Sequence, residues 1–143
     1  MSGIRAKNTK PELQIRRAMH AQGFRFRLHS AVVPGRPDMV FPKYHAAAFV
    51  HGCFWHGHRC PLFKLPDTRR QFWSEKIERN RQRDRIVQKQ LSEAGWRVAI
   101  MWECALRGPG RLGIQDAAKQ IAMWLPALDN DHLELRAAKR GAA

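Results

Sequence analysis

The spacing of apolar side chains predicts a helix near each end of the chain. Apolar residues recur at helical intervals over residues 10–22, with Thr9 in the N-cap position and Gly23 where a helix commonly stops. A second amphipathic pattern covers residues 114–125. Helices at both ends leave the middle of the chain to supply a sheet.

Short segments between these helices have strand character. Residues 24–29 alternate apolar and polar side chains, which predicts a strand exposed on one face. Residues 38–41 and 46–51 are predicted to pair as a hairpin across a Pro-containing turn, and residues 96–102 form the clearest strand pattern in the chain. These strands predict a central sheet.

Helical character returns at about Thr68, with Asp67 as the expected cap, and Gly95 marks its end. The fold class expected from this order is α/β: a three-layer domain with a central mixed sheet. We expect residues 1–143 to form one domain with its core at about 7–125, and residues 127–143 to be a loose tail.

Charge narrows the range of partners. The 143 residues carry 26 Lys and Arg against 12 Asp and Glu, a formal net charge of +14, which fits a polyanion and disfavours a cationic substrate. No apolar stretch approaches the roughly 20 residues of a membrane span, and the basic N-terminus lacks the apolar segment of a signal peptide. We expect a cytoplasmic protein without membrane contact.

Negative charge is scarce in the first 66 residues, where Glu12 and Asp38 are the two carboxylate side chains among eleven Lys and Arg. Basic surroundings favour the charged form of Asp38, which makes it a candidate Mg²⁺ ligand beside phosphate. Its alternative role is to cap a turn. Glu12 stands three residues after Thr9, so a capping box is an alternative for it.

Residues 51–60 hold three histidines and two cysteines, a density that points to metal. Structural zinc is usually held by four N/S ligands. Cys53, Cys60 and the distant Cys104 supply the thiols, with His58 as one candidate for the fourth ligand. Spacing alone leaves His51 and His56 as alternatives.

Three aromatic residues lie in or near this loop: Phe54, Trp55 and Trp73. Aromatic side chains in a basic loop can stack on bases or wedge between base pairs. Their alternative role is to fill core or cover the metal site.

Several segments together resemble the very-short-patch-repair DNA mismatch endonucleases. These are the Pro-Gly-Arg-Pro-Asp run at 34–38, the His-Gly-Cys-Phe-Trp-His run at 51–56, the segment at 72–77, and the segments at 95–98 and 102–107. The resemblance spans residues 7–111 in order. It implies a restriction-endonuclease-like fold and an Mg²⁺-dependent, strand-specific nick beside the thymine of a T·G mismatch, which arises when 5-methylcytosine deaminates and whose cutting initiates very short patch repair.

The resemblance also implies roles for individual residues. Asp38 and the backbone carbonyl of Val50 match the Mg²⁺ ligands, His56 matches the general base, and His51 and Glu12 match further active-site residues. The remaining matched positions are the structural zinc ligands Cys53, His58, Cys60 and Cys104 and the DNA wedge Phe54, Trp55 and Trp73.

The implied partner is double-stranded DNA with a T·G mismatch, with other mismatch-repair proteins as a second class of partner, and we expect a monomer at the bacterial nucleoid. Two features depart from the family pattern. Gly57 and Arg59 interrupt what is often a histidine run, and the segment before the first helix is short. The rival interpretations are a catalytically inert, zinc-stabilised DNA-binding module and a basic RNA-binding protein.

Overall fold

The computed structural model describes residues 9–60 and 62–138. Its elements in chain order are α1 (Lys10–Ala21), β1 (Met39–Phe41), the 3-10 turn η1 (Pro42–Tyr44), β2 (Ala46–His51), α2 (Arg70–Glu93), β3 (Arg97–Trp102), α3 (Glu103–Leu106), α4 (Ile114–Trp124) and β4 (His132–Leu135). The first eight residues and 139–143, which include the short segment before the first helix and the end of the expected tail, lie outside this description.

The four strands form one mixed sheet in the order β1-β2-β3-β4. β1 and β2 are antiparallel, whereas β2, β3 and β4 run parallel to one another. The predicted mixed α/β architecture and the hairpin of β1 with β2 are therefore confirmed. Because β2 and β3 are parallel, the loops that leave His51 and Trp102 start at the same edge of the sheet.

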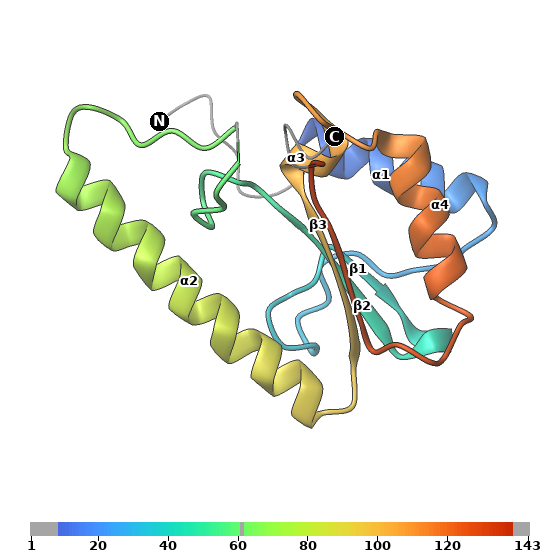
Figure 1. Ribbon diagram of the computed structural model, residues 1–143. Coiled ribbons are helices and arrows are strands. Elements are labelled where there is room, and N and C mark those ends of the chain that lie inside the picture. Colours follow the sequence, from blue (N-terminus) through green and yellow to red (C-terminus); the bar gives the residue numbers. More distant parts are fainter. Residues whose placement is uncertain (1–8, 61, 139–143) are drawn as a thin grey trace.

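Helices cover both faces of the sheet (Figure 1). α1 and α4 pack on one face, where Ile15, Met19 and Ile121 join the larger apolar core. α2 crosses the other face and contributes Leu91 to a smaller core that includes Phe49. Successive residues of β2 alternate between the two cores, as the two-residue period of a strand requires. The three predicted layers are present.

Two local predictions are wrong. Residues 24–29 do not form a strand, because their sheet contact is the single bridge of Arg27 to Val40. Phe24 and Phe26 instead pack their rings against Phe41, so side-chain burial explains the alternating pattern. Asp67 does not cap α2, which begins at Arg70.

The expected loose tail is also wrong for part of its length, because His132–Leu135 forms β4 alongside β3. Arg97 of β3 is buried, and its guanidinium donates hydrogen bonds to four backbone carbonyls in the turn between α4 and β4, those of Trp124, Leu125, Ala127 and Asn130. These bonds hold the chain that leads into the last strand. Sequence patterning missed them because Arg97 resembles an ordinary polar strand residue.

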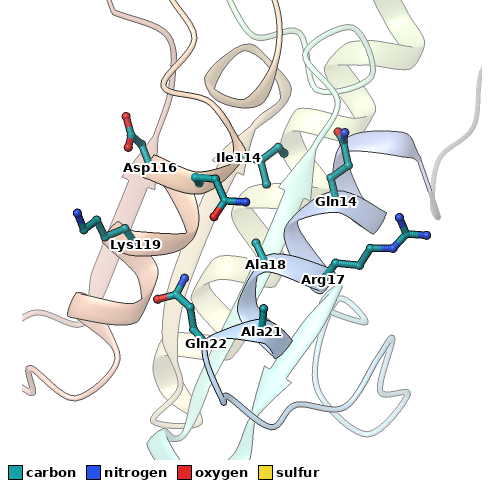
Figure 2. A pocket seen from close by; sticks show the side chains of 9 residues that line it. Gln14, Arg17, Ala18, Ala21, Gln22, Ile114, Asp116 and Lys119 are labelled. Atoms are coloured by element: carbon teal, nitrogen blue, oxygen red, sulfur yellow. The ribbon is translucent and has the colours of Figure 1, made fainter.

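A groove of about 660 Å³ lies between α1 and α4 (Figure 2). Gln14 and Arg17 line it from α1, and Asp116 and Lys119 line it from α4. It contains none of the site residues predicted from the sequence. Among the helices that the structure describes, none has the length and apolar composition that a membrane crossing requires.

Candidate active site and metal-binding clusters

A group of soft metal donors gathers where β2 and β3 end. The ligand atoms of Cys53, His58, Cys60 and Cys104 all lie within 4.8 Å of one another, and Cys104 Sγ is 3.6 Å from His58 Nδ1. Tetrahedral zinc with Zn–S bonds of about 2.3 Å places its ligands about 3.8 Å apart. The four residues therefore have the chemistry and spacing of a structural zinc site.

Electrostatics also favours a cation in this cluster. Burial raises the pKa of the Cys53 thiol, and it raises that of Cys104 as well. Two buried thiolates are costly without a positive ion, whereas zinc binding offsets that cost. The pKa of His58 is lowered, first by burial and then by Arg136, which keeps its imidazole neutral, as a ligand must be.

Gly57 explains one departure from the family pattern. Its φ is +61°, and a Cβ at this position would lie 2.6 Å from Cγ2 of Ile77 and 2.7 Å from Nε of Arg81 on α2. Arg81 also donates a hydrogen bond to the Gly57 carbonyl, and Asn80 donates one to Trp55 O at 2.9 Å. Glycine therefore lets the loop lie directly against α2.

A second cluster centres on Asp38, just before β1. The Val50 amide donates to Asp38 Oδ2 at 2.6 Å. Since the N–H and C=O of one residue in an extended strand point to the same side, the Val50 carbonyl is directed towards the Asp38 side of β2. The two predicted Mg²⁺ ligands are thus neighbours, and both offer the oxygen donors that this ion prefers.

The pKa of Asp38 differs from the sequence expectation. Burial raises it, and this effect outweighs the hydrogen bond from the Val50 amide and the influence of His29 and Arg16, all of which lower it. The expectation that basic surroundings would favour the ionised form is therefore wrong as a net result. A bound divalent cation would offset the cost of the buried charge.

Glu12 is buried, with 1% of its surface exposed. Its amide donates to Thr9 Oγ1 at 3.4 Å, which supplies one half of the predicted capping box. Its carboxylate contacts Arg16, and Oε2 lies 3.2 Å from His29 Nε2. His29 in turn is 3.5 Å from Asp38 Oδ1, so Glu12, His29 and Asp38 form one cluster.

A third cluster contains two stacked histidines. The His51 and His56 rings lie 3.9 Å apart and nearly parallel. His56 Nδ1 is 2.5 Å from Asp84 Oδ2 on α2, which leaves Nε2 as the nitrogen able to accept a proton. The pKa of His51 is well below its usual value, first because of burial and then because of His56, so its ring is neutral near pH 7.

One cavity of about 550 Å³ connects the second and third clusters. It runs between the end of β2 and one side of α2. Its lining consists of His29, Gly35, Arg36, Asp38, Phe49, Val50, His51, Trp55, His56, Lys76, Asn80, Arg83, Asp84, Val87 and Gln88. Three histidines, two carboxylates and three basic side chains thus face the same space.

The predicted wedge residues lie together beside this cavity. Phe54 is 5.4 Å from Trp55 and 5.5 Å from Trp73 between ring centroids. All three side chains are half-buried, and Phe63 and Phe72 extend the aromatic group. These rings form a contiguous aromatic surface at the rim of the cavity, supported by both the loop and α2.

Sequence reasoning missed four residues of this site: Arg16, His29, Lys76 and Asp84. Asp84 stands between Arg83 and Arg85, so the criterion that identified Glu12 and Asp38, a carboxylate isolated among basic residues, applies to it as well. His29 and Arg16 carry no comparable signal, because their positions near Glu12 depend on how α1 and residues 24–29 pack.

Comparison with known proteins identifies the family. The profile of a family described as DNA mismatch endonuclease Vsr matches residues 1–62. The DNA mismatch endonuclease Vsr of Escherichia coli (strain K12) is 45% identical over 125 residues, which cover 87% of this chain and 80% of that protein. This chain belongs to the Vsr family of DNA mismatch endonucleases. The segments that resemble such enzymes therefore reflect true kinship.

Other relatives of this Vsr-family protein are described as nicking enzymes. The type II nicking enzyme V.XorIIP of Xanthomonas oryzae pv. oryzae is 50% identical over 112 residues, 78% of this chain and 82% of that enzyme. The type II nicking enzyme V.NmeAIP of Neisseria meningitidis is 41% identical over 107 residues, 75% of this chain and 76% of that enzyme. Family membership thus makes this protein a nuclease by descent.

Proposed function

We propose that this protein nicks one strand of duplex DNA beside the thymine of a T·G mismatch produced by deamination of 5-methylcytosine, and so initiates very short patch repair. The observation that carries the proposal is the meeting of the Asp38 cluster and the His51–His56 pair in one cavity, bordered by aromatic rings. The proposed catalytic groups lie around one end of the central sheet, which fits the proposed restriction-endonuclease-like fold.

His56 is the proposed general base. In phosphodiester hydrolysis, water attacks the phosphorus, the bond from phosphorus to the leaving oxygen breaks, and the attacking water loses a proton. His56 Nε2 accepts that proton, while Asp84 holds Nδ1 and stabilises the imidazolium that forms. His51, kept neutral by burial, orients the phosphate beside it.

Asp38 and the Val50 carbonyl would hold Mg²⁺ in this scheme, and Glu12 would add negative charge from the same cluster. The ion would supply positive charge that stabilises the phosphate as negative charge develops on its oxygens. The amide of Val50 fixes one oxygen of Asp38, Oδ2, and the other, Oδ1, faces His29.

The zinc proposed at Cys53, His58, Cys60 and Cys104 is structural, since four protein ligands leave no open position for substrate. It ties the loop after β2 to the end of β3. The loop carries His56 and the aromatic pair Phe54 and Trp55, so the metal fixes both the base and the wedge relative to the sheet.

DNA binding combines charge with stacking. The formal charge of +14 and the arginines of α2, namely Arg79, Arg81, Arg83 and Arg85, neutralise phosphates sequence-independently. Insertion of Phe54, Trp55 and Trp73 beside the mismatch costs on the order of a few kcal/mol of base unstacking, and less where pairing is already weak. This difference in cost is the proposed source of mismatch selectivity.

The decisive test is a nicking assay with Mg²⁺ on matched duplexes that differ by one base pair, T·G against T·A. We expect a single-strand nick in the T·G duplex and none in the control. Asp38→Asn should abolish nicking while retaining DNA binding, and the exposed Asp116→Asn on α4 should behave as wild type. Binding without nicking by the unaltered protein would instead establish the rival DNA-binding module.

A further inference from the structure

His29 occupies a position in the Asp38 cluster that the proposed reaction does not yet use. It comes from the irregular segment that follows α1, and its ring reaches the cavity between two carboxylates. The Nε2 atom lies 3.2 Å from Glu12 Oε2 and 3.5 Å from Asp38 Oδ1. A single ring nitrogen therefore faces both acidic groups.

The hydrogen bonds of the cluster indicate which atoms are available to a cation. Asp38 Oδ2 accepts the Val50 amide, whereas Oδ1 faces His29. Adjacent ligands of an octahedral ion at about 2.1 Å lie about 3.0 Å apart. The separation of Nε2 and Oδ1 is close to that value, so the two atoms can share one ion after a shift of a few tenths of an ångström.

Nε2 is the ring nitrogen of His29 that faces this cluster. It lies close to both carboxylates, and Arg16 Nη2, which also contacts Glu12 Oε2, is 3.1 Å from it. A neutral imidazole offers a metal ion one nitrogen lone pair in the plane of its ring. An ion held by Asp38 would therefore meet His29 at Nε2.

We propose that His29 supplies a nitrogen ligand, through Nε2, to the divalent cation held by Asp38. The inference rests on the proposed function, because it takes the catalytic cation to sit at Asp38. Replacing one oxygen donor by imidazole shifts a site away from Mg²⁺ and towards first-row transition metals. The site then binds Mn²⁺ in preference to Mg²⁺ more strongly than an all-oxygen site does.

The test is pulsed electron paramagnetic resonance of the full chain with substoichiometric Mn²⁺. Thiolates select softer ions, so Mn²⁺ should not occupy the cluster of cysteines and His58. Bound Mn²⁺ in the wild type should show coupling to a directly ligated ¹⁴N nucleus. His29→Gln and His29→Asn should lose that coupling, whereas His20→Gln, an exposed histidine at the end of α1, should retain it. Calorimetry should show the preference for Mn²⁺ over Mg²⁺ falling about tenfold in both His29 variants.

Bound Mn²⁺ without nitrogen coupling in the wild type would overturn the proposal, as would coupling that persists in folded His29→Gln. Mn²⁺ binding by Asp38→Asn distinguishes an error in the role of His29 from an error in the proposed function. If Asp38→Asn abolishes Mn²⁺ binding while the His29 variants keep the nitrogen coupling, only the role of His29 is wrong. If Asp38→Asn leaves Mn²⁺ binding intact, the cation site itself lies elsewhere and both proposals fail.

Discussion

The cluster of Cys53, His58, Cys60 and Cys104 and the cluster around Asp38 each bring together groups that can hold a metal ion, but they are built in opposite ways. Three of the four donors of the first come from one loop of eight residues, Cys53 to Cys60, and only Cys104 is distant. The second gathers Glu12 from a helix, His29 from an irregular segment and Asp38 from the position just before β1. With the proposed zinc bound, we expect the first cluster to support the fold, whereas the second depends on the fold to bring its residues together.

This contrast predicts different consequences of mutation. Two of the thiols in the first cluster are buried and the loop has no regular structure, so loss of the proposed metal should cost stability. The Asp38 cluster is buried against the sheet, where removing charge relieves a desolvation cost. Mutations in the first cluster should therefore act mainly on folding, and mutations in the second mainly on catalysis.

The largest effect is expected from Cys104→Ala. Removal of this ligand opens the link between the loop and the end of β3, and loss of a structural metal is among the changes that exceed about 4–5 kcal/mol. Metal analysis should show zinc well below one equivalent, and urea unfolding should show a much lower midpoint. Arg107→Ala, an exposed neighbour, should change stability by less than about 0.5 kcal/mol. Full zinc content in Cys104→Ala would contradict the four-ligand site.

Asp38→Asn should have the opposite effect to Cys104→Ala, with a large loss of activity and no loss of stability. We expect nicking to fall by about 10³-fold or more, because a site that loses its metal carboxylate loses several kcal/mol of transition-state stabilisation. Stability at pH 7 should stay the same or rise, since burial raises the pKa of Asp38 and the ionised carboxylate is less favoured in the folded state than in the unfolded chain. Single-turnover nicking and urea unfolding measure the two effects separately. A large loss of stability would place Asp38 with the structural residues.

Asp84→Asn should lower the nicking rate by about 10²-fold, within the usual range for general acid–base catalysis. The amide can no longer stabilise the charged ring of His56 during proton transfer. The check is the maximal rate at saturating DNA, together with the pH dependence of that rate, whose acidic limb should disappear in His56→Ala. An Asp84→Asn variant that changes only DNA affinity would exclude this role.

The smallest effect concerns pH and His51. Its pKa in the folded protein is well below 6.5, so as pH falls the unfolded chain binds this proton first. The contribution of the neutral ring to stability is therefore complete above about pH 6.5 and is lost progressively as pH falls towards the lower folded value. Urea unfolding at pH 7.5 and 5.5 gives the free energy of unfolding at each pH. The loss between the two pH values should be about 1 kcal/mol smaller in His51→Gln than in wild type. Equal pH dependence in both proteins would contradict the buried, neutral state of His51.

The fold could be predicted from the sequence wherever pattern and local packing agree. The helix of α1, the hairpin of β1 with β2, and β3 follow directly from apolar periodicity and from turn residues. Residues 24–29 could not be assigned, because alternating burial of Phe24 and Phe26 against Phe41 imitates a strand. β4 was missed because its segment is short and polar, and a parallel partner at a sheet edge leaves no turn signal in the sequence.

The sequence by itself determined the local chemistry: histidines and cysteines concentrated in residues 51–60, aromatic residues among them, and carboxylates isolated in a basic chain. These are properties of residue type and short spacing, which a linear pattern records. Only the tertiary structure decided that Asp84 holds His56, that His29 faces Asp38, and that burial raises the pKa of Asp38. Each of these depends on a distance or a degree of burial between segments far apart in the chain, and these quantities exist only after the sheet and α2 have packed together.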